Sequence, residues 1–144
     1  MQRCEKILIR LLYLIYILLV LFFCFYKFSS SSLDLGKSFL GIRLDRYAHF
    51  IMFFPYPFIS WLTCRYAVNN PFLRRYALAL TLVSGLAFAA LTEISQDIFF
   101  NSRQGDILDF AADAAAIVTA SLIVHFAGKH IVRLFMYLCP ASKK

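Results

Sequence analysis

An aspartate, an arginine and a histidine near residue 47 are spaced so that one helix could present them together. Asp45 and His49 are four residues apart, and Arg46 and His49 are three apart, so a helix places them on one stripe of its surface. On such a stripe His49 could act as a general base oriented by Asp45. Arg46 could donate two hydrogen bonds at once to a phosphate or carboxylate.

Two further groups of polar residues have the same helical spacing. They are Glu93, Gln96 and Asp97, followed by Asp106, Asp109 and Asp113. Each group falls on one stripe of its helix, and Arg103 lies in the short segment between them. Clustered carboxylates could hold a hard cation such as magnesium. The chain has no HExxH, CxxC or glycine-rich phosphate loop, so we predict neither a resident metal nor a cofactor.

The composition identifies the kind of protein that carries these groups. Of 144 residues, 61% are hydrophobic and 16% charged, and the mean hydropathy is +0.70. A core of this size cannot hide so many apolar side chains, which come in runs rather than singly. The net charge of +7 is scattered between these runs, which argues against a nucleic-acid binder. The class indicated is a polytopic membrane protein.

Four apolar runs are long enough to cross a bilayer as helices. They cover residues 7–26, 47–68, 76–100 and 106–128. Each supplies about 30 Å of helix or more, the thickness of the hydrocarbon core. We predict a single all-α domain over residues 1–144, a bundle of four transmembrane helices. Residues 129–144 are predicted to form a cytoplasmic interfacial tail.

Particular residues shape this predicted bundle. Pro55 and Pro57 remove backbone donors and predict a kink in the second helix. The third run is rich in alanine, with Ser84 and Gly85, which gives a small surface that lets helices approach closely.

The charges predict the orientation. Of the 15 Lys and Arg residues, ten fall on the side that carries both termini, so the positive-inside rule makes both termini cytoplasmic. All the acids except Glu5 lie on or near the outer side. Glu93 and Asp113 fall in the outer third of the bilayer, where charge is costly unless it is paired and faces a bundle interior or a wet cavity. We therefore predict a polar pocket that opens outward between the second, third and fourth helices. Cys24 alone lies near the outer face, so no structural disulfide is predicted.

The order of these motifs resembles the VanZ-like family from residue 45 to about residue 120. The segment Asp45-Arg46-Tyr47-Ala48-His49-Phe50 is similar to the family's Asp-Lys-x-x-His-Phe. Glu93-Ile94-Ser95-Gln96 is similar to its Glu-x-x-Gln. Arg103 and the segment Asp106-Ile107-Leu108-Asp109 follow in the family's order and spacing.

This chain also departs from the family's pattern. Arg46 stands where lysine is usual, which keeps the charge but changes the donor geometry. Asp113 stands where asparagine is usual and adds a negative charge when ionised. Ala116 and Ala120 stand where glycines are common.

The resemblance implies a small multi-pass protein of the bacterial cytoplasmic membrane, in a family named for a member linked to teicoplanin resistance. It supplies no agreed catalytic residues. Its expected partners are membrane lipids and a lipid-linked or cell-wall-precursor ligand, with no role for nucleic acid. The sequence does not define an oligomeric state.

Three readings of the polar residues remain open. In the first, they bind the head group of an envelope lipid or wall precursor and so influence glycopeptide sensitivity. The ligand-binding residues are then Arg46, His49, Glu93, Gln96, Arg103, Asp106, Asp109 and Asp113. In the second, the protein is an intramembrane enzyme acting on a lipid-linked phosphate or ester. The catalytic candidates are then His49, Asp45 and Glu93.

In the third reading, Arg46 and Arg103 neutralise carboxylates of neighbouring helices and only lock the bundle. This accounts poorly for the number of acids at the predicted outer mouth. Six carboxylates lie there with three arginines, so some must be protonated, hydrated or bound to a cation. That excess favours a functional site.

Overall fold

The computed structural model describes residues 3–25, 38–39, 41–99 and 107–138, and their fold is all-α, as predicted. The helices are α1 (Arg3–Phe25), α2 (Leu44–Phe53), α3 (Tyr56–Leu62), the π-helical turn η1 (Thr63–Ala67), α4 (Pro71–Arg75), α5 (Ala77–Phe99) and α6 (Ile107–Leu138). A short hairpin, which the sequence did not predict, pairs β1 (Ser38–Phe39) with β2 (Ile42–Arg43) in antiparallel register. Gly41 has a φ of 77°, a conformation that favours glycine, at the turn between them.

Three helices of the described chain are long and apolar enough to cross a membrane. They are Arg3–Phe25, Ala77–Ile98 and Ile107–Tyr137. They correspond to the first, third and fourth predicted runs, and they indicate a membrane protein. Large apolar side chains point outward along them, and Phe126 of α6 is 80% exposed. Helix α6 continues without interruption from the predicted fourth span into the predicted tail, as far as Leu138.

The second predicted run is not one continuous helix. It is broken at Phe54 and Pro55 into α2 and α3, and the π-helical turn η1 follows. The predicted kink is therefore confirmed as a break of two residues, both of which keep right-handed helical backbone angles. The hydroxyl of Tyr16 in α1 donates to the carbonyl of Met52 at 2.6 Å, beside the break. A neighbouring helix thus supplies a hydrogen-bond donor where proline has disturbed the ladder, as apolar surroundings require.

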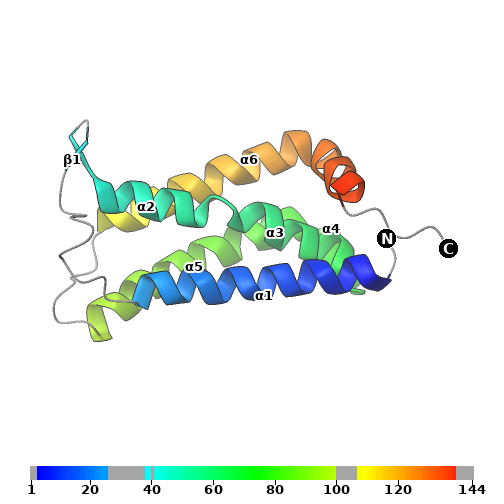
Figure 1. The fold of residues 1–144 in the computed structure, drawn as a ribbon, viewed down its shortest axis with the longest axis horizontal. Helices are drawn as coiled ribbons and strands as arrows, with labels where there is room; N and C mark the ends of the chain where they lie inside the picture. The colour runs from blue at the N-terminus through cyan, green and yellow to red at the C-terminus, as the bar shows by residue number, and fades with distance from the viewer. Residues whose placement is uncertain (1–2, 26–37, 40, 100–106, 139–144) are drawn as a thin grey trace.

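Helix α6 packs along both α2 and α5, while α1 lies against α5 and η1 (Figure 1). One buried cluster lies among α1, α2, α5 and α6 and includes Phe53, Ala89 and Ile117. A second joins Ile9 of α1 to Leu62 and Ala67. Ala89 of α5 and Ala116 of α6, both in the first cluster, are fully buried. Small residues therefore let α5 and α6 approach closely, as the sequence predicted for the third run.

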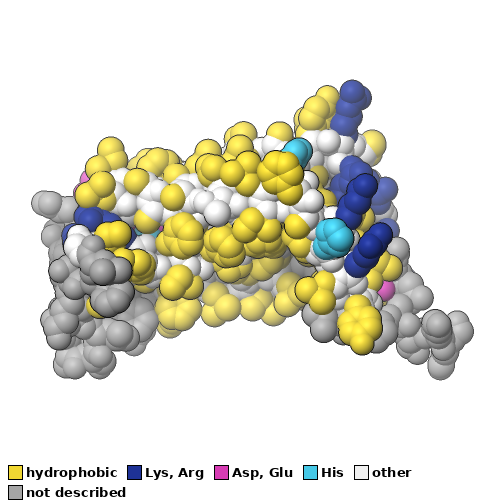
Figure 2. Space-filling model, turned by 90° about the horizontal axis from the view of Figure 1, so that it is seen from above, with side chains coloured by type: hydrophobic (Ala, Val, Ile, Leu, Met, Phe, Trp, Pro, Cys, Tyr) yellow, Lys and Arg dark blue, Asp and Glu magenta, His cyan; other side chains and the backbone are white. Residues whose placement is uncertain are grey.

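The two ends of the molecule differ in charge. We call the end that holds the start of α1, η1 and the end of α6 the terminal end, and the opposite end the polar end (Figure 1). At the terminal end Lys6 donates to the Asn69 side chain at 3.1 Å, and Arg10 donates to the carbonyl of Ala67 at 2.6 Å. Figure 2 shows lysine and arginine side chains gathered at this end.

Candidate functional site

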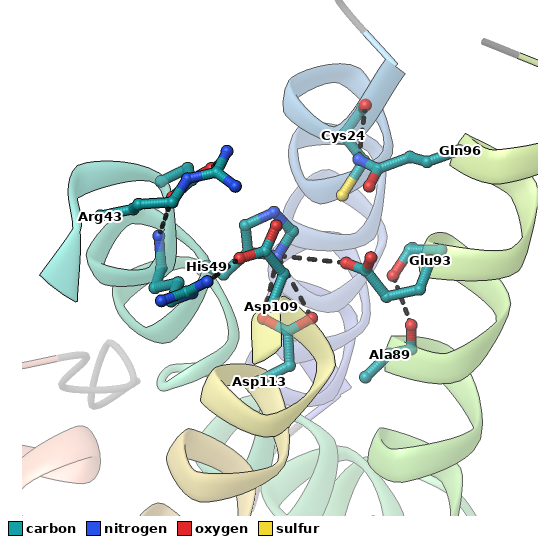
Figure 3. A network of polar contacts seen from close by, with 11 residues as sticks. Cys24, Arg43, His49, Ala89, Glu93, Gln96, Asp109 and Asp113 are labelled. Atoms are coloured by element: carbon teal, nitrogen blue, oxygen red, sulfur yellow. Dashed lines mark hydrogen bonds and ion pairs between the residues drawn. The ribbon is translucent and has the colours of Figure 1, made fainter. Parts of the chain in front are cut away.

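A compact group of three ionisable side chains lies at the polar end, and we call it the polar centre. His49 comes from α2, Glu93 from α5 and Asp113 from α6 (Figure 3). The Nδ1 atom of His49 lies 3.2 and 3.3 Å from the two carboxylate oxygens of Asp113. It lies 3.5 Å from Oε1 of Glu93. Three helices distant in sequence therefore converge on one imidazole nitrogen.

The polar centre is buried. The exposed fractions of His49, Glu93 and Asp113 are 5%, 7% and 0%. Local helix geometry explains this burial, because each side chain shares a helix face with a core residue. His49 is one turn before the fully buried Phe53, and Glu93 is one turn after the fully buried Ala89. The helix faces that pack into the apolar core therefore also bury the side chains of the polar centre.

An ion pair lies one helical turn from the polar centre and joins α2 to α6, two of the three helices that form that centre. Arg46 of α2 and Asp109 of α6 approach to 3.6 Å between Nε and Oδ1. Arg46 precedes His49 by three residues, and Asp109 precedes Asp113 by four. Their side chains are 21% and 13% exposed, so the pair lies between the buried centre and the surface. Contact between α2 and α6 is thus polar over about two turns.

Asp45 does not orient His49, in contrast to the pairing that the sequence suggested. One of its oxygens accepts from the Arg43 guanidinium, and the other accepts from the backbone N–H of Arg46 at 2.9 Å. This N–H belongs to the first turn of α2, where backbone donors lack intrahelical partners and the helix dipole favours a negative charge. Asp45 therefore stabilises the start of α2. The carboxylate beside His49 is that of Asp113, in the place that the sequence analysis predicted for Asp45.

The remaining predicted site residues lie apart from the polar centre or outside the described chain. Gln96 is buried and donates to the carbonyl of Cys24 at 2.9 Å, which ties α5 to α1. Asp97 is exposed. Arg103 and Asp106 lie outside the described residues. Of the predicted ligand set, the structure brings together Arg46, His49, Glu93, Asp109 and Asp113.

A cavity at the terminal end was not predicted from the sequence. Its volume is about 370 Å³, and four of its lining side chains are basic. Its lining comprises Trp61, Arg65, Tyr66, Arg74, Arg75, Ala77, Leu78, Val124, His125, Gly128 and Lys129. From the sequence, Arg74 and Arg75 are interpreted as determinants of orientation, with a weak attraction to anionic inner-leaflet lipids as the alternative. The signal that could have found the cavity is the combination of basic residues with Trp61 and Tyr66 at the same interface.

The polar centre has the residue types for two kinds of chemistry. A histidine beside a carboxylate can take up or release a proton. One ligand atom from each of His49, Glu93 and Asp113 lies within 4.8 Å of the others, so these three residues could also hold a metal ion. Comparisons with family models, curated proteins and solved structures give no match to this chain. The fold and the site therefore define only a class: a helical membrane protein with a buried centre of histidine and carboxylates.

Proposed function

We propose that the chain is a four-span membrane protein of the VanZ-like kind. In addition to α1, α5 and α6, the segment formed by α2, α3 and η1 makes one crossing, the second in chain order. Residues 44–67 measure about 36 Å as helix, enough for the hydrocarbon core. The segment begins at the polar end and finishes at Ala67, which accepts from Arg10 at the terminal end. Interrupted helices cross membranes where neighbouring helices satisfy the freed backbone, and Tyr16 does so here.

In this proposal the terminal end faces the cytoplasm and the polar end faces outward. Basic residues concentrate next to the cytoplasm in membrane proteins. At the terminal end the described basic residues are Arg3, Lys6, Arg10, Arg65, Arg74, Arg75, Lys129 and Arg133. At the polar end they are Arg43 and Arg46.

The proposed activity is binding of the head group of a membrane lipid or lipid-linked wall precursor at the polar centre, with an influence on sensitivity to teicoplanin-type glycopeptides. The observation that supports it is the convergence of five ionisable side chains from three helices at one end of an apolar bundle. Buried charges in a membrane are costly and mark functional sites. Arg46 is the half-buried member and offers the planar donor group that suits a phosphate.

A second candidate is an intramembrane enzyme acting on a lipid-linked phosphate or ester. The contact of His49 with Asp113 favours it, because a carboxylate beside an imidazole can orient it as a general base. Incubation of the purified protein with a polyisoprenyl phosphate and release of inorganic phosphate would identify this activity. Binding without turnover would favour the first candidate.

The binding proposal is tested by lipid-dependent stability of the full chain in detergent. The thermal midpoint is measured with a polyisoprenyl phosphate, with the corresponding alcohol and with phosphatidylcholine. A ligand at a hundred times its Kd stabilises a protein by about 2.7 kcal/mol. We expect the phosphate to raise the midpoint of the parent and the two other lipids to leave it unchanged.

Variants assign the effect to the polar centre and the neighbouring Arg46–Asp109 pair. Glu93→Gln and Arg46→Lys should reduce the rise, whereas Asp97→Asn, an exposed position on the same helix as Glu93, should keep it. If both site variants lose folded yield and the parent gains nothing from any lipid, the charges only lock the bundle and the binding proposal is rejected.

A further inference from the structure

We propose that His49, Glu93 and Asp113 form a binding site for one divalent transition-metal cation of the zinc and manganese class. The proposal goes beyond head-group recognition and stands independently of it, because it concerns only the protein's own ligands. Its basis is the position of three donor atoms, one from each of three helices, within 4.8 Å of one another in the buried interior.

The distances from His49 Nδ1 fit metal coordination as well as they fit hydrogen bonding. Zinc holds nitrogen and oxygen ligands at about 2.0–2.2 Å, so two ligands of a tetrahedral site are about 3.3–3.6 Å apart. His49 Nδ1 lies 3.2 and 3.3 Å from the Asp113 oxygens and 3.5 Å from Glu93 Oε1. Hydrogen bonds between charged nitrogen and carboxylate groups are shorter, about 2.7–2.9 Å. An imidazole nitrogen also carries at most one proton, whereas Nδ1 faces oxygens of two carboxylates.

The charge of the donor set fits a divalent cation. A neutral imidazole and two carboxylates carry a charge of −2, which one divalent cation neutralises. Neutralisation matters here because the three side chains are at least nine-tenths buried, where separated charges are costly. A neutral histidine is also the form that binds metals.

The donor types select the class of metal. One nitrogen and two oxygens suit zinc, manganese or iron, whereas magnesium and calcium favour oxygen ligands alone. For the same ligands, affinity rises from manganese to zinc, so zinc is expected to bind more tightly. Three protein ligands leave a fourth position of a tetrahedral zinc site for water or for an oxygen of another ligand.

Neighbouring contacts hold the three donors in place. The Arg46–Asp109 pair joins α2 to α6 one turn from His49 and Asp113. Helix α5, which carries Glu93, packs along α6. Closure of the site around a cation therefore requires side-chain rotation, with the three helices remaining where they are.

The test is metal binding by the full chain, purified in detergent with an affinity tag that contains no histidine. The protein is stripped with a chelator and equilibrated with Zn²⁺, Mn²⁺ or Mg²⁺ alone, and bound metal is measured by mass spectrometry. Absorption of Co²⁺, used as a spectroscopic substitute for zinc, reports nitrogen and oxygen ligation. We expect about one Zn²⁺ per chain, weaker retention of Mn²⁺ and no retention of Mg²⁺.

Variants locate the bound metal. Loss of a residue that only supports a ligand reduces metal affinity about 10–100-fold, so His49→Gln and Asp113→Asn should reduce it by at least about 100-fold. The double variant His125→Gln with His130→Gln removes two exposed histidines and should retain the metal. Asp97→Asn should also retain it.

The parent alone can overturn the proposal, even if the ligand variants do not fold. Less than about one-tenth of an equivalent of Zn²⁺ after equilibration rejects the site, as does loss of binding in the double histidine variant with retention in Asp113→Asn. No lipid is present in these measurements. A failure of head-group binding therefore leaves their outcome unaffected, and the converse is also true.

Discussion

Substitution of Gly85 by alanine tests how closely α5 packs against α3 and α6. A Cβ atom at this position would lie 3.0 Å from Cε1 of Tyr56 and 3.1 Å from Cγ2 of Ile117. Carbon atoms pack favourably at about 3.5–4.0 Å. Neither neighbour can move easily, because both side chains are almost fully buried and the Tyr56 hydroxyl donates to Ser84 at 2.9 Å.

The magnitude follows from two opposing effects. Overpacking of a well-filled core costs about 1–3 kcal/mol, and replacing glycine by alanine in a helix gains about 1 kcal/mol. The expected loss for Gly85→Ala is therefore about 1 kcal/mol and at most about 2 kcal/mol. Gly128→Ala is the matched control, since the three atoms nearest its Cβ all belong to the Trp61 ring, the first at 3.0 Å, and that ring is half-buried. Its expected change is within about 0.5 kcal/mol.

The assay is unfolding by titration with sodium dodecyl sulfate in mixed micelles, followed by circular dichroism and by the fluorescence of Trp61. This residue is the chain's single tryptophan and lies in α3. The free energy of unfolding is compared for the parent, Gly85→Ala and Gly128→Ala. Equal losses at the two glycines, or a gain at Gly85, would refute the close packing of α5 against α3 and α6.

Three further predictions concern the same bundle. Arg10→Met removes the hydrogen bond to the carbonyl of Ala67 and should lower the free energy of unfolding by about 1.5–3 kcal/mol in the same titration; an unchanged value would contradict the contact. Tyr56→Phe removes the hydrogen bond to Ser84 and should cost about 1 kcal/mol, so a more stable variant would argue against it. The orientation is tested in a variant that keeps Cys4, which is exposed, as its single cysteine. A membrane-impermeant maleimide should label this thiol only after the cells are permeabilised. Labelling in intact cells would contradict a cytoplasmic N-terminus.

The long helices could be predicted from the sequence because length and composition decide them. The apolar runs that became α1, α5 and α6 need no tertiary partner to be recognised. Pro55 likewise identified the disturbed position in the second run. Whether a helix bends or stops at proline depends on the neighbouring donors, and the sequence does not place Tyr16 beside the break. The division of this run into α2 and α3 was therefore beyond prediction, as was the hairpin at Gly41.

The candidate site was predictable as a set of residues but not as a set of contacts. Helical spacing placed Asp45 and His49 on one stripe, and this favoured their pairing. Asp45 instead serves the start of its own helix, a competing role available to any acid in a first turn. The partner of His49 depends on how α6 is rotated against α2, and packing between helices sets that rotation. Spacing within one helix contains no information about it.

The hydrogen bonds from α1 to the segment from α2 to η1 have a bearing on the protein's biogenesis. Two carbonyls of this segment, those of Met52 and Ala67, accept from Tyr16 and Arg10 of α1. Synthesis from the N-terminus delivers α1 to the bilayer first, so both donors are present when the interrupted segment leaves the ribosome. α1 is therefore expected to act as an insertion scaffold for the segment that follows it. A chain whose first helix is exchanged for a generic apolar helix should insert α5 and α6 but leave the segment from α2 to η1 misplaced and open to quality-control proteolysis.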